Sequence, residues 1–216
     1  MRKSILFLVF ALAIVSCREQ QQPPITYSGS QKQAIIDNIL SRRAIRKYTQ
    51  QQVSTEQIDT IMRSAIYAPS AWNKQPWEIR VIQNPDVLKE IDKRFVSYAE
   101  KNEPSGRAAK YREPGFSIYH NSPTLIVIAS DKENPNAKLD AGIALQNILL
   151  GAHALGLGTC PLALIVPTFN APENKDLMKT LNIPEGYEVA VGIALGYPAE
   201  SPVAPIRYAE KAKIIK

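Results

Sequence analysis

The chain has little of the chemistry on which most metal sites and disulfides depend. Its 216 residues include only two cysteines and two histidines. Cys17 belongs to an N-terminal leader, described below, so Cys160 has no partner for an intramolecular disulfide. His120, His153 and Cys160 do not have the spacing of ordinary metal ligands. We therefore expect no metal centre and no intramolecular disulfide.

Several signatures of common enzyme classes are also missing. No G-x-x-x-x-G-K-[ST] phosphate loop occurs, and the stretch Gly156–Pro161 lacks the third glycine of a dinucleotide-binding fingerprint. No G-x-S-x-G elbow is present, and no motif pairs a nucleophile with either histidine. P-loop nucleotidases, Rossmann dehydrogenases and serine hydrolases are therefore poorly supported.

The charge is modest. The sequence carries 26 Lys and Arg against 20 Asp and Glu, for a formal net charge of +6. Removing residues 1–16, which include two basic residues and no acids, leaves +4 (6 minus 2). A mildly basic chain does not predict a nucleic-acid partner. The remaining 200 residues (216 minus 16) suffice for one domain with a substantial core.

The N-terminus has the form of a bacterial lipoprotein leader. Two basic residues precede an apolar run, Ile5–Val15, that is too short to span a bilayer, which takes about 20 residues. A serine and then Cys17 follow, as in a lipobox. We expect residues 1–16 to be a signal peptide, Cys17 to be lipidated and residues 17–30 to form a flexible tether. The protein would then be an exported lipoprotein, anchored on the non-cytoplasmic side of a membrane. An ordinary cleaved signal, or a membrane anchor with an incidental cysteine, is the alternative.

Helical and strand patterns alternate along residues 31–216 without a regular βαβ rhythm, which favours an α+β domain. Ser54 stands three residues before Gln57, as in a capping box. The segment from Lys101 to Gly115 is expected to be a loop or lid, and residues 199–216 a surface arm. The helical patterns cover residues 32–43, 54–69, 84–95, 138–158 and 171–182, and the strand patterns cover residues 77–83, 124–130 and 187–198.

Four segments could surround an anionic, planar ligand. The basic stretch "SRRAIRKY" offers guanidinium groups that bind phosphate through paired hydrogen bonds. The stretch "PSAWNKQPW" offers hydroxyl and amide groups able to bind a ring with carbonyl and imide groups. Gly156 and Gly158 allow close approach of the backbone, and Arg207 needs a partner in the otherwise apolar "APIRY".

Each of these features also has a simpler interpretation. The arginines could be a solvated helix end, where cations favour the last carbonyls. Ser70 and Asn73 could simply shape a turn, and the two glycines could end a helix. Cys160 is more typical of a small buried residue than of a redox centre. His153, on the long apolar helix, is expected to be a satisfied core residue.

The order of these motifs resembles the nitroreductase family of FMN-dependent oxidoreductases. The resemblance rests on "SRRAIRKY", "APSAWNKQPW", "DAGIALQNILLGAHALGLGT", "VGIALGYPAE" and the late Arg207, and it covers the chain from about Lys32 onward. It implies an α+β flavoprotein with a central, mostly antiparallel sheet flanked by helices. It also implies a homodimer with a long interface helix, FMN at the subunit interface, and NADH or NADPH as electron donor.

By position, the resemblance implies a set of cofactor contacts. Three arginines would meet the phosphate and ribityl region, with a fourth closing on the phosphate from the C-terminal arm. A turn would face the ring with Trp77 packed beneath it, and backbone after the long helix would approach the reactive side. No side chain is expected to be catalytic, since the flavin carries the chemistry. The implied cofactor-binding residues are Arg42, Arg43, Ala44, Arg46, Ser70, Asn73, Gln75, Gly158, Thr159 and Arg207.

Two positions depart from the family pattern. Ala44 stands where the family commonly has a serine, and Pro205 stands where it often has a basic residue. Both changes remove a contact to the phosphate, so we expect weaker FMN binding than usual.

The resemblance implies an oxidoreductase that reduces nitroaromatic or quinone acceptors by ping-pong hydride transfer through FMN. A flavin-dependent dehalogenase or flavin-fragmenting enzyme of the same superfamily, and a lipid-tethered FMN-binding module without catalysis, are the alternatives. Export conflicts with an NAD(P)H donor, because that pool lies in the cytoplasm.

Overall fold

The computed structural model describes residues 26–102 and 108–216. The expected signal peptide, Cys17 and most of the expected tether lie outside the described residues. The elements are α1 (Gly29–Ser41), α2 (Thr55–Ile66), η1 (Ala71–Asn73), β1 (Trp77–Ile82), α3 (Pro85–Asn102), η2 (Ala108–Arg112), β2 (Thr124–Asp131), α4 (Ala137–Ala154), β3 (Gly158–Leu162), α5 (Val166–Asn170), η3 (Pro172–Asn174), α6 (Lys175–Thr180), β4 (Tyr187–Gly196) and η4 (Ala209–Lys211).

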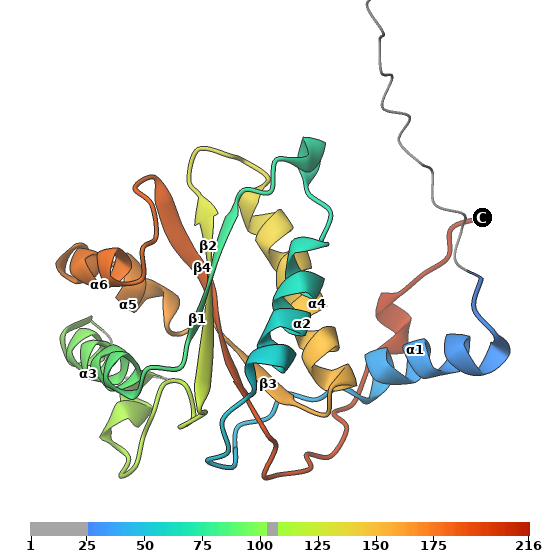
Figure 1. Ribbon diagram of the computed structural model, residues 1–216, viewed down its shortest axis with the longest axis horizontal. Helices are drawn as coiled ribbons and strands as arrows, with labels where there is room; N and C mark the ends of the chain where they lie inside the picture. Colours follow the sequence, from blue (N-terminus) through green and yellow to red (C-terminus); the bar gives the residue numbers. More distant parts are fainter. Residues whose placement is uncertain (1–25, 103–107) are drawn as a thin grey trace, which may run out of the picture.

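The strands form one antiparallel sheet between two layers of helices. Its order is β1-β2-β4-β3, and each neighbouring pair is antiparallel. Helices α2 and α4 lie on one side of the sheet, and α3, α5 and α6 lie on the other (Figure 1). The predicted α+β class, with an antiparallel sheet flanked by helices, is confirmed.

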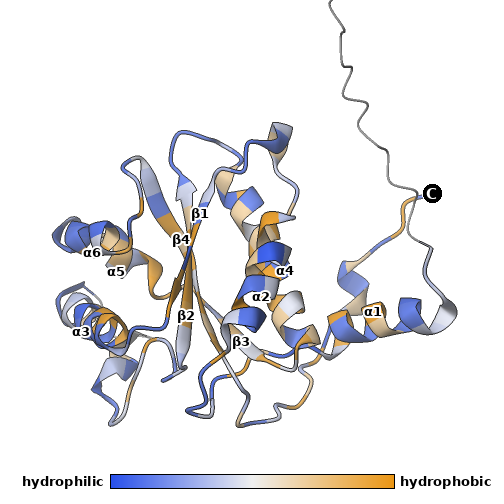
Figure 2. Cartoon of the chain, viewed as in Figure 1, coloured by the Kyte–Doolittle hydropathy of each residue, from blue (hydrophilic) through white to orange (hydrophobic). Residues whose placement is uncertain are grey.

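Strand β2 shows how the sequence builds a core on both faces. Successive side chains of a strand point to opposite faces. Leu125 and Val127 join the cluster that includes residues of α3 and α5, whereas Ile126 and Ile128 join the cluster of α2 and α4. Apolar residues accordingly gather in the strands and on the helix faces turned toward them (Figure 2). The continuous apolar run is explained by burial on both faces.

Two helix ends form as their residues predict. Ser54 Oγ accepts the Gln57 N–H, and the Gln57 side chain accepts the Ser54 N–H, which completes the capping box before α2. After α4, Gly156 has φ +75°, and the Leu157 N–H donates to Ala152 O at 2.9 Å. This is a Schellman C-cap, so the helix-ending role of Gly156 is confirmed.

Helix α1 forms where a helix was predicted but differs from the expectation in two ways. It begins at Gly29, so the last two residues assigned to the tether, Gly29 and Ser30, lie in its first turn. None of its residues is buried within this chain. Its apolar side chains are instead 44–67% exposed; they are Ile35, Ile36, Ile39 and Leu40.

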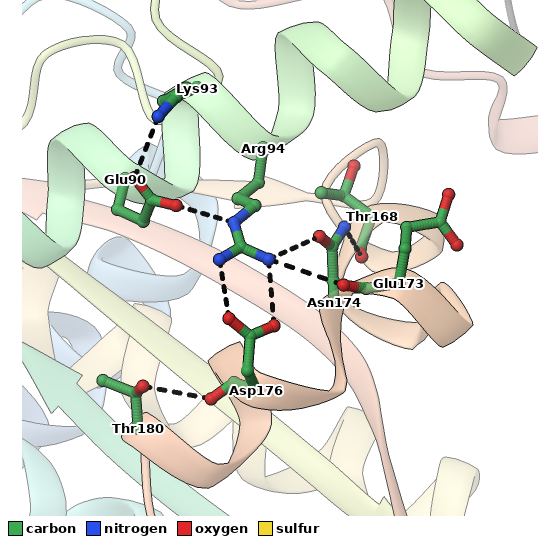
Figure 3. A network of polar contacts seen from close by, with 8 residues as sticks. All are labelled: Glu90, Lys93, Arg94, Thr168, Glu173, Asn174, Asp176 and Thr180. Carbon is green, nitrogen blue, oxygen red and sulfur yellow. Dashed lines mark hydrogen bonds and ion pairs between the residues drawn. The ribbon is translucent and has the colours of Figure 1, made fainter.

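A polar network fixes α3 against the segment that contains η3 and α6 (Figure 3). Arg94 on α3 contacts Asp176 through Nη2 and Oδ2 at 2.6 Å and Glu90 through Nε and Oε1 at 2.6 Å. Its Nη1 donates to Asn174 Oδ1 at 3.1 Å. The guanidinium thus joins segments about 80 residues apart in sequence.

The C-terminal arm lies over the surface, as expected, on the same side of the molecule as α1 (Figure 1). Val203, Ile206 and Ile215 in this arm are 80–91% exposed. Among the described residues, no helix has the length and apolar character needed to cross a membrane.

Candidate functional site

The basic segment after α1 is held in an extended conformation beside β3. The helix ends at Ser41, and Ala44 then forms a parallel bridge with Thr159. The Ile45 N–H donates to Thr159 O at 2.9 Å, and the Tyr48 hydroxyl donates to Ile45 O. The segment is therefore part of the folded core and not a solvated extension of α1.

Gly158 is required by this packing. A Cβ on Gly158 would lie 2.8 Å from Ile45 Cγ1, closer than carbon atoms tolerate. We expected Gly158 and Thr159 to approach the ring of a cofactor with their backbone. Ile45 packs against Gly158, and Thr159 is only 1% exposed; the approach of their backbone to a ring stays a prediction. The close approach that the glycine permits is thus between two segments of the protein.

The three arginines have different surroundings. Arg43 Nη1 donates to Leu40 O at 2.7 Å and to Arg42 O at 2.8 Å, at the end of α1. This is the helix-end role that we considered for the whole basic run, and it is stabilising because the last carbonyls carry negative charge. Arg42 and Arg46 have other surroundings than Arg43.

Arg42 is the most informative group in the segment. Its Nη1 is buried and has no hydrogen-bond partner among the described residues, and the same is true of Thr159 Oγ1. Burial is the main cause that lowers the pKa of Arg42, and the neighbouring charges of Arg43 and Arg207 lower it further. A buried donor without a partner costs about 1–3 kcal/mol. An anion would satisfy it and offset the clustered positive charge.

Arg207 lies close enough to Arg42 for its charge to lower the pKa of Arg42; that the two residues share an anion stays a prediction. It comes from the exposed arm, whereas Arg42 comes from the folded core. The two residues are 165 positions apart in the sequence (207 minus 42), so only the fold brings them near each other.

Arg46 opens onto a cavity of about 410 Å³, lined by residues of α3, of η2 and the segment after it, and of β3 and the two residues that follow it. Aromatic and aliphatic side chains form most of its wall, and a few polar groups interrupt them. The lining residues are Arg46, Phe95, Lys110, Phe116, Ser117, Ile118, His120, Cys160, Pro161, Leu162, Ala163 and Leu164. We call it the Arg46 cavity.

Burial favours the uncharged form of two groups in this cavity. It lowers the pKa of His120, and the charge of Arg46 lowers it further. Burial raises the pKa of the Cys160 thiol, and the residue is 3% exposed. The prediction that Cys160 is a buried packing residue is consistent with both observations.

Sequence reasoning missed most of this cavity. Only Arg46 among its lining residues had been assigned to the cofactor. Lys110, Phe116 and His120 lie in or near the segment expected to be a loop or lid, whose composition carries no motif. The stretch "PLAL", which spans the last two residues of β3 and the two that follow it, offered one available signal. An apolar run at the end of an edge strand must face either a cavity or another segment.

The turn "PSAWNKQ" is rigid and uses its own polar side chains. Ser70 Oγ accepts the Gln75 N–H at 2.9 Å, and Gln75 Nε2 donates to Asn73 Oδ1 at 3.2 Å. Trp72, Asn73 and Gln75 have φ values of 51°, 54° and 47°. Such backbone costs about 1–3 kcal/mol for each residue and concentrates at functional sites.

Trp77 follows this turn as the first residue of β1. It is 8% exposed, belongs to the cluster of α2 and α4, and donates its N–H to Gln75 O at 2.8 Å. The turn-shaping interpretation of Ser70 and Asn73 is therefore correct, although it does not exclude a second role in binding.

The fold places the turn and the arginines at opposite ends of α4. The Ala71 N–H donates to Asp140 Oδ2 near the start of the helix, whereas Ser41 Oγ lies 2.9 Å from His153 Nε2 near its end. Thirteen residues of helix separate Asp140 from His153, or about 20 Å at 1.5 Å per residue. One chain therefore does not bring the two groups of predicted ligands together (Figure 1).

His153 also differs from its expected role. It is not a core residue, because it lies at the surface where α4 meets the end of α1 and bonds to Ser41. Burial lowers its pKa, and the charges of Arg42 and Arg43 lower it further.

Comparison with known proteins identifies the family. The model of the nitroreductase family matches residues 39–197. A candidate NADH dehydrogenase/NAD(P)H nitroreductase of Methanothermobacter thermautotrophicus is 32% identical over 175 residues, which are 79% of this chain and 81% of the relative. The chain belongs to the nitroreductase family.

Solved structures agree with this assignment. An FMN-dependent nitroreductase from Clostridium difficile is 31% identical, with a TM-score of 0.77 over 86% of this chain and all of that one. A nitroreductase from Bacteroides fragilis has a TM-score of 0.78 at 24% identity over 84% of this chain and 98% of that one, which shows the same fold. The resemblance inferred from the motifs is confirmed.

Proposed function

We propose that the protein is an FMN-dependent NAD(P)H oxidoreductase that reduces nitroaromatic, quinone or similar acceptors. Membership of the nitroreductase family supports this proposal, as do the names of its relatives, which include an FMN reductase (NADPH) of Bacillus subtilis at 27% identity. With a quinone, the reaction would be NAD(P)H + H⁺ + quinone → NAD(P)⁺ + hydroquinone.

The observation that carries the proposal is the buried Nη1 of Arg42, which has no hydrogen-bond partner within residues 26–102 and 108–216. It lies among positive charges that include Arg207. A phosphate monoester offers several charged acceptor oxygens, and guanidinium groups match them in geometry. The residues present thus fit the phosphate end of FMN. Ala44 has no hydroxyl to contribute, so the arginines would carry most of this binding.

The Arg46 cavity is the proposed place for the ring. Its wall from Pro161 to Leu164 is largely apolar, and Arg46 links it to the phosphate end. FMN, when bound, would supply hydride acceptance and donation. The chain would bind and orient it, exclude water with Phe116 and Leu164, and keep His120 uncharged.

Contacts to the ring edge would come from a second copy of the chain. Ser70, Asn73 and Gln75 lie near the start of α4, whereas the arginines of the same chain follow Ser41, which contacts the end of that helix. The exposed apolar residues of α1 and of the C-terminal arm offer a surface that a second copy would bury. We therefore propose a homodimer whose two sites each combine arginines from one chain with the turn of the other.

A mixing experiment tests the shared site. One variant would carry Arg42→Gln, and a second would carry Ser70→Ala with Asn73→Ala. Each homodimer should have two defective sites, whereas a mixed dimer should have one intact site and one doubly defective site. Unfolding and refolding the two variants together should restore FMN binding to half of the sites in mixed dimers. If no mixture binds FMN better than the separate variants, both ligand groups act within one chain.

A visible spectrum tests the cofactor itself. The chain from Thr26 onward, which retains the Ser28 cap of α1, should be yellow or should bind added FMN. Anaerobic addition of NADH or NADPH should then bleach the flavin. A protein that binds FMN and is not bleached would be the non-catalytic binding module or would use another donor. A protein that does not bind FMN would contradict the proposal.

A reductive dehalogenase is the second candidate within the same superfamily. An iodotyrosine deiodinase of Haliscomenobacter hydrossis is 26% identical over 81% of this chain and 84% of that protein. Release of iodide from iodotyrosine by the reduced protein would favour this activity over nitro or quinone reduction.

We also propose that Cys17 anchors the protein to a membrane on its non-cytoplasmic side. The support is the leader pattern in the sequence. Replacing Cys17 with Ser should release the protein from membranes, and unchanged fractionation would show that lipid at Cys17 is not the anchor. In an exported protein the physiological donor would have to differ from the cytoplasmic NAD(P)H pool.

A further inference from the structure

Trp72 has a conformation that protein folding alone does not explain. Its side chain is 84% exposed, although tryptophan is among the most buried residues on average. Its φ of 51° lies in the left-handed region, which non-glycine residues rarely adopt. A large, mostly apolar side chain is therefore exposed to water at a residue whose backbone conformation is strained.

The turn around Trp72 is fixed at both ends. The Ser70 hydroxyl accepts the Gln75 N–H at 2.9 Å after the tryptophan, and the Ala71 N–H donates to Asp140 Oδ2 at 3.2 Å before it. On its own chain the indole borders a hollow that is also lined by Pro76 and Tyr187. Contacts within one chain thus hold the backbone on both sides of Trp72.

The position of Trp72 within the turn determines which groups its side chain can contact. It lies between Ser70 and Asn73, the residues proposed to reach the flavin ring of a second chain. If that turn reaches the ring, then Trp72 enters the same space. An indole face stacks favourably on a planar aromatic ring, above all when its own water-exposed area is buried as well.

We propose that Trp72 of one chain forms an aromatic wall of the acceptor site of the other, and so selects planar aromatic acceptors. This inference rests on the proposed function and on the proposed homodimer. It names one residue, supplied in trans, as the determinant of acceptor class, whereas FMN itself would be bound by the arginines and by the polar side chains of the turn.

The test uses the full chain with bound FMN and compares two acceptors. One is 1,4-naphthoquinone, which is planar and aromatic, and the other is ferricyanide, which is neither. Trp72→Ala should raise KM for the quinone about tenfold, because the stacking contact is lost. The rate with ferricyanide and the Kd of FMN should not change. Trp72→Phe, which retains an aromatic face, should stay within about twofold of the natural protein.

Further measurements separate the remaining explanations. Trp72→Leu retains apolar area without an aromatic face and should resemble Trp72→Ala. Sedimentation should show the same oligomeric state for each variant, and a loss of dimer in Trp72→Ala would mean that the indole is only an interface contact, which overturns the inference. An unchanged KM for the quinone also overturns it. Failure of the natural protein to bind FMN would instead contradict the proposed function.

Discussion

The side chain of Ile45 occupies the space that a Cβ on Gly158 would need, with Cγ1 only 2.8 Å from that position. Gly158→Ala should push Ile45, and with it the segment that carries the arginines, away from β3. We expect the free energy of unfolding to fall by about 1–3 kcal/mol, as measured by urea denaturation, and FMN binding to weaken. Gly29→Ala is the matched control, because a Cβ there meets nothing within 4 Å. Equal stability of the two variants would contradict this packing.

Arg42→Gln should weaken FMN binding by about 10- to 100-fold, the size expected for loss of a charge-assisted hydrogen bond. Riboflavin has no phosphate, so its affinity should change little. Comparing the two flavins by fluorescence titration therefore isolates the phosphate contact. Lys47→Gln is the control, because Lys47 is exposed and lies outside the proposed site. If Arg42→Gln weakens both flavins equally, Arg42 does not bind the phosphate.

Arg94→Met should lower the thermal stability, because it removes the guanidinium that joins α3 to α6. The hydrogen bond from Arg94 lowers the pKa of Asp176 in the folded protein. A depressed carboxylate pKa stabilises the fold above the unfolded pKa, and this stabilisation is lost as pH falls through the folded pKa. The difference in Tm between Arg94→Met and the natural protein should therefore shrink below about pH 4. A difference that stays constant to pH 2 would show that the lost stability is not electrostatic. Lys93→Met, one position earlier and more exposed, serves as control.

Cys160 should react slowly with iodoacetamide at pH 8 in the folded chain from Thr26 onward. Burial raises the pKa of its thiol, and the thiolate is the reactive form. Alkylation followed by mass spectrometry should show a large increase in rate in denaturant. Rapid modification of the folded protein would indicate that Cys160 is accessible through the Arg46 cavity.

Much of the fold could be predicted because its signals are local. The capping box of Ser54 and Gln57 lies within four residues, and the C-cap at Gly156 depends on its own φ. The strand β2 is a run of neighbours with no charge before Asp131. In each case adjacent residues supply both the pattern and the hydrogen bonds that stabilise it.

The Arg46 cavity could not be predicted in the same way. Phe116 and His120 come from an irregular segment, and Leu164 follows an edge strand. These residues meet only because α3 and the segments after η2 and β3 pack on one face of the sheet. The residues next to them in the sequence form no pattern that predicts this contact.

By itself the sequence determined the family, the α+β class and the identity of the basic segment and the turn, since short motifs specify these. Only the tertiary structure decided how they are used. It made Arg43 a helix cap and placed the Trp72 turn at the far end of α4. It also left Nη1 of Arg42 buried without a hydrogen-bond partner in the part of the chain that the structure describes. Long-range packing against the helices and strands sets these relationships, because it fixes distances that spacing along the chain does not encode.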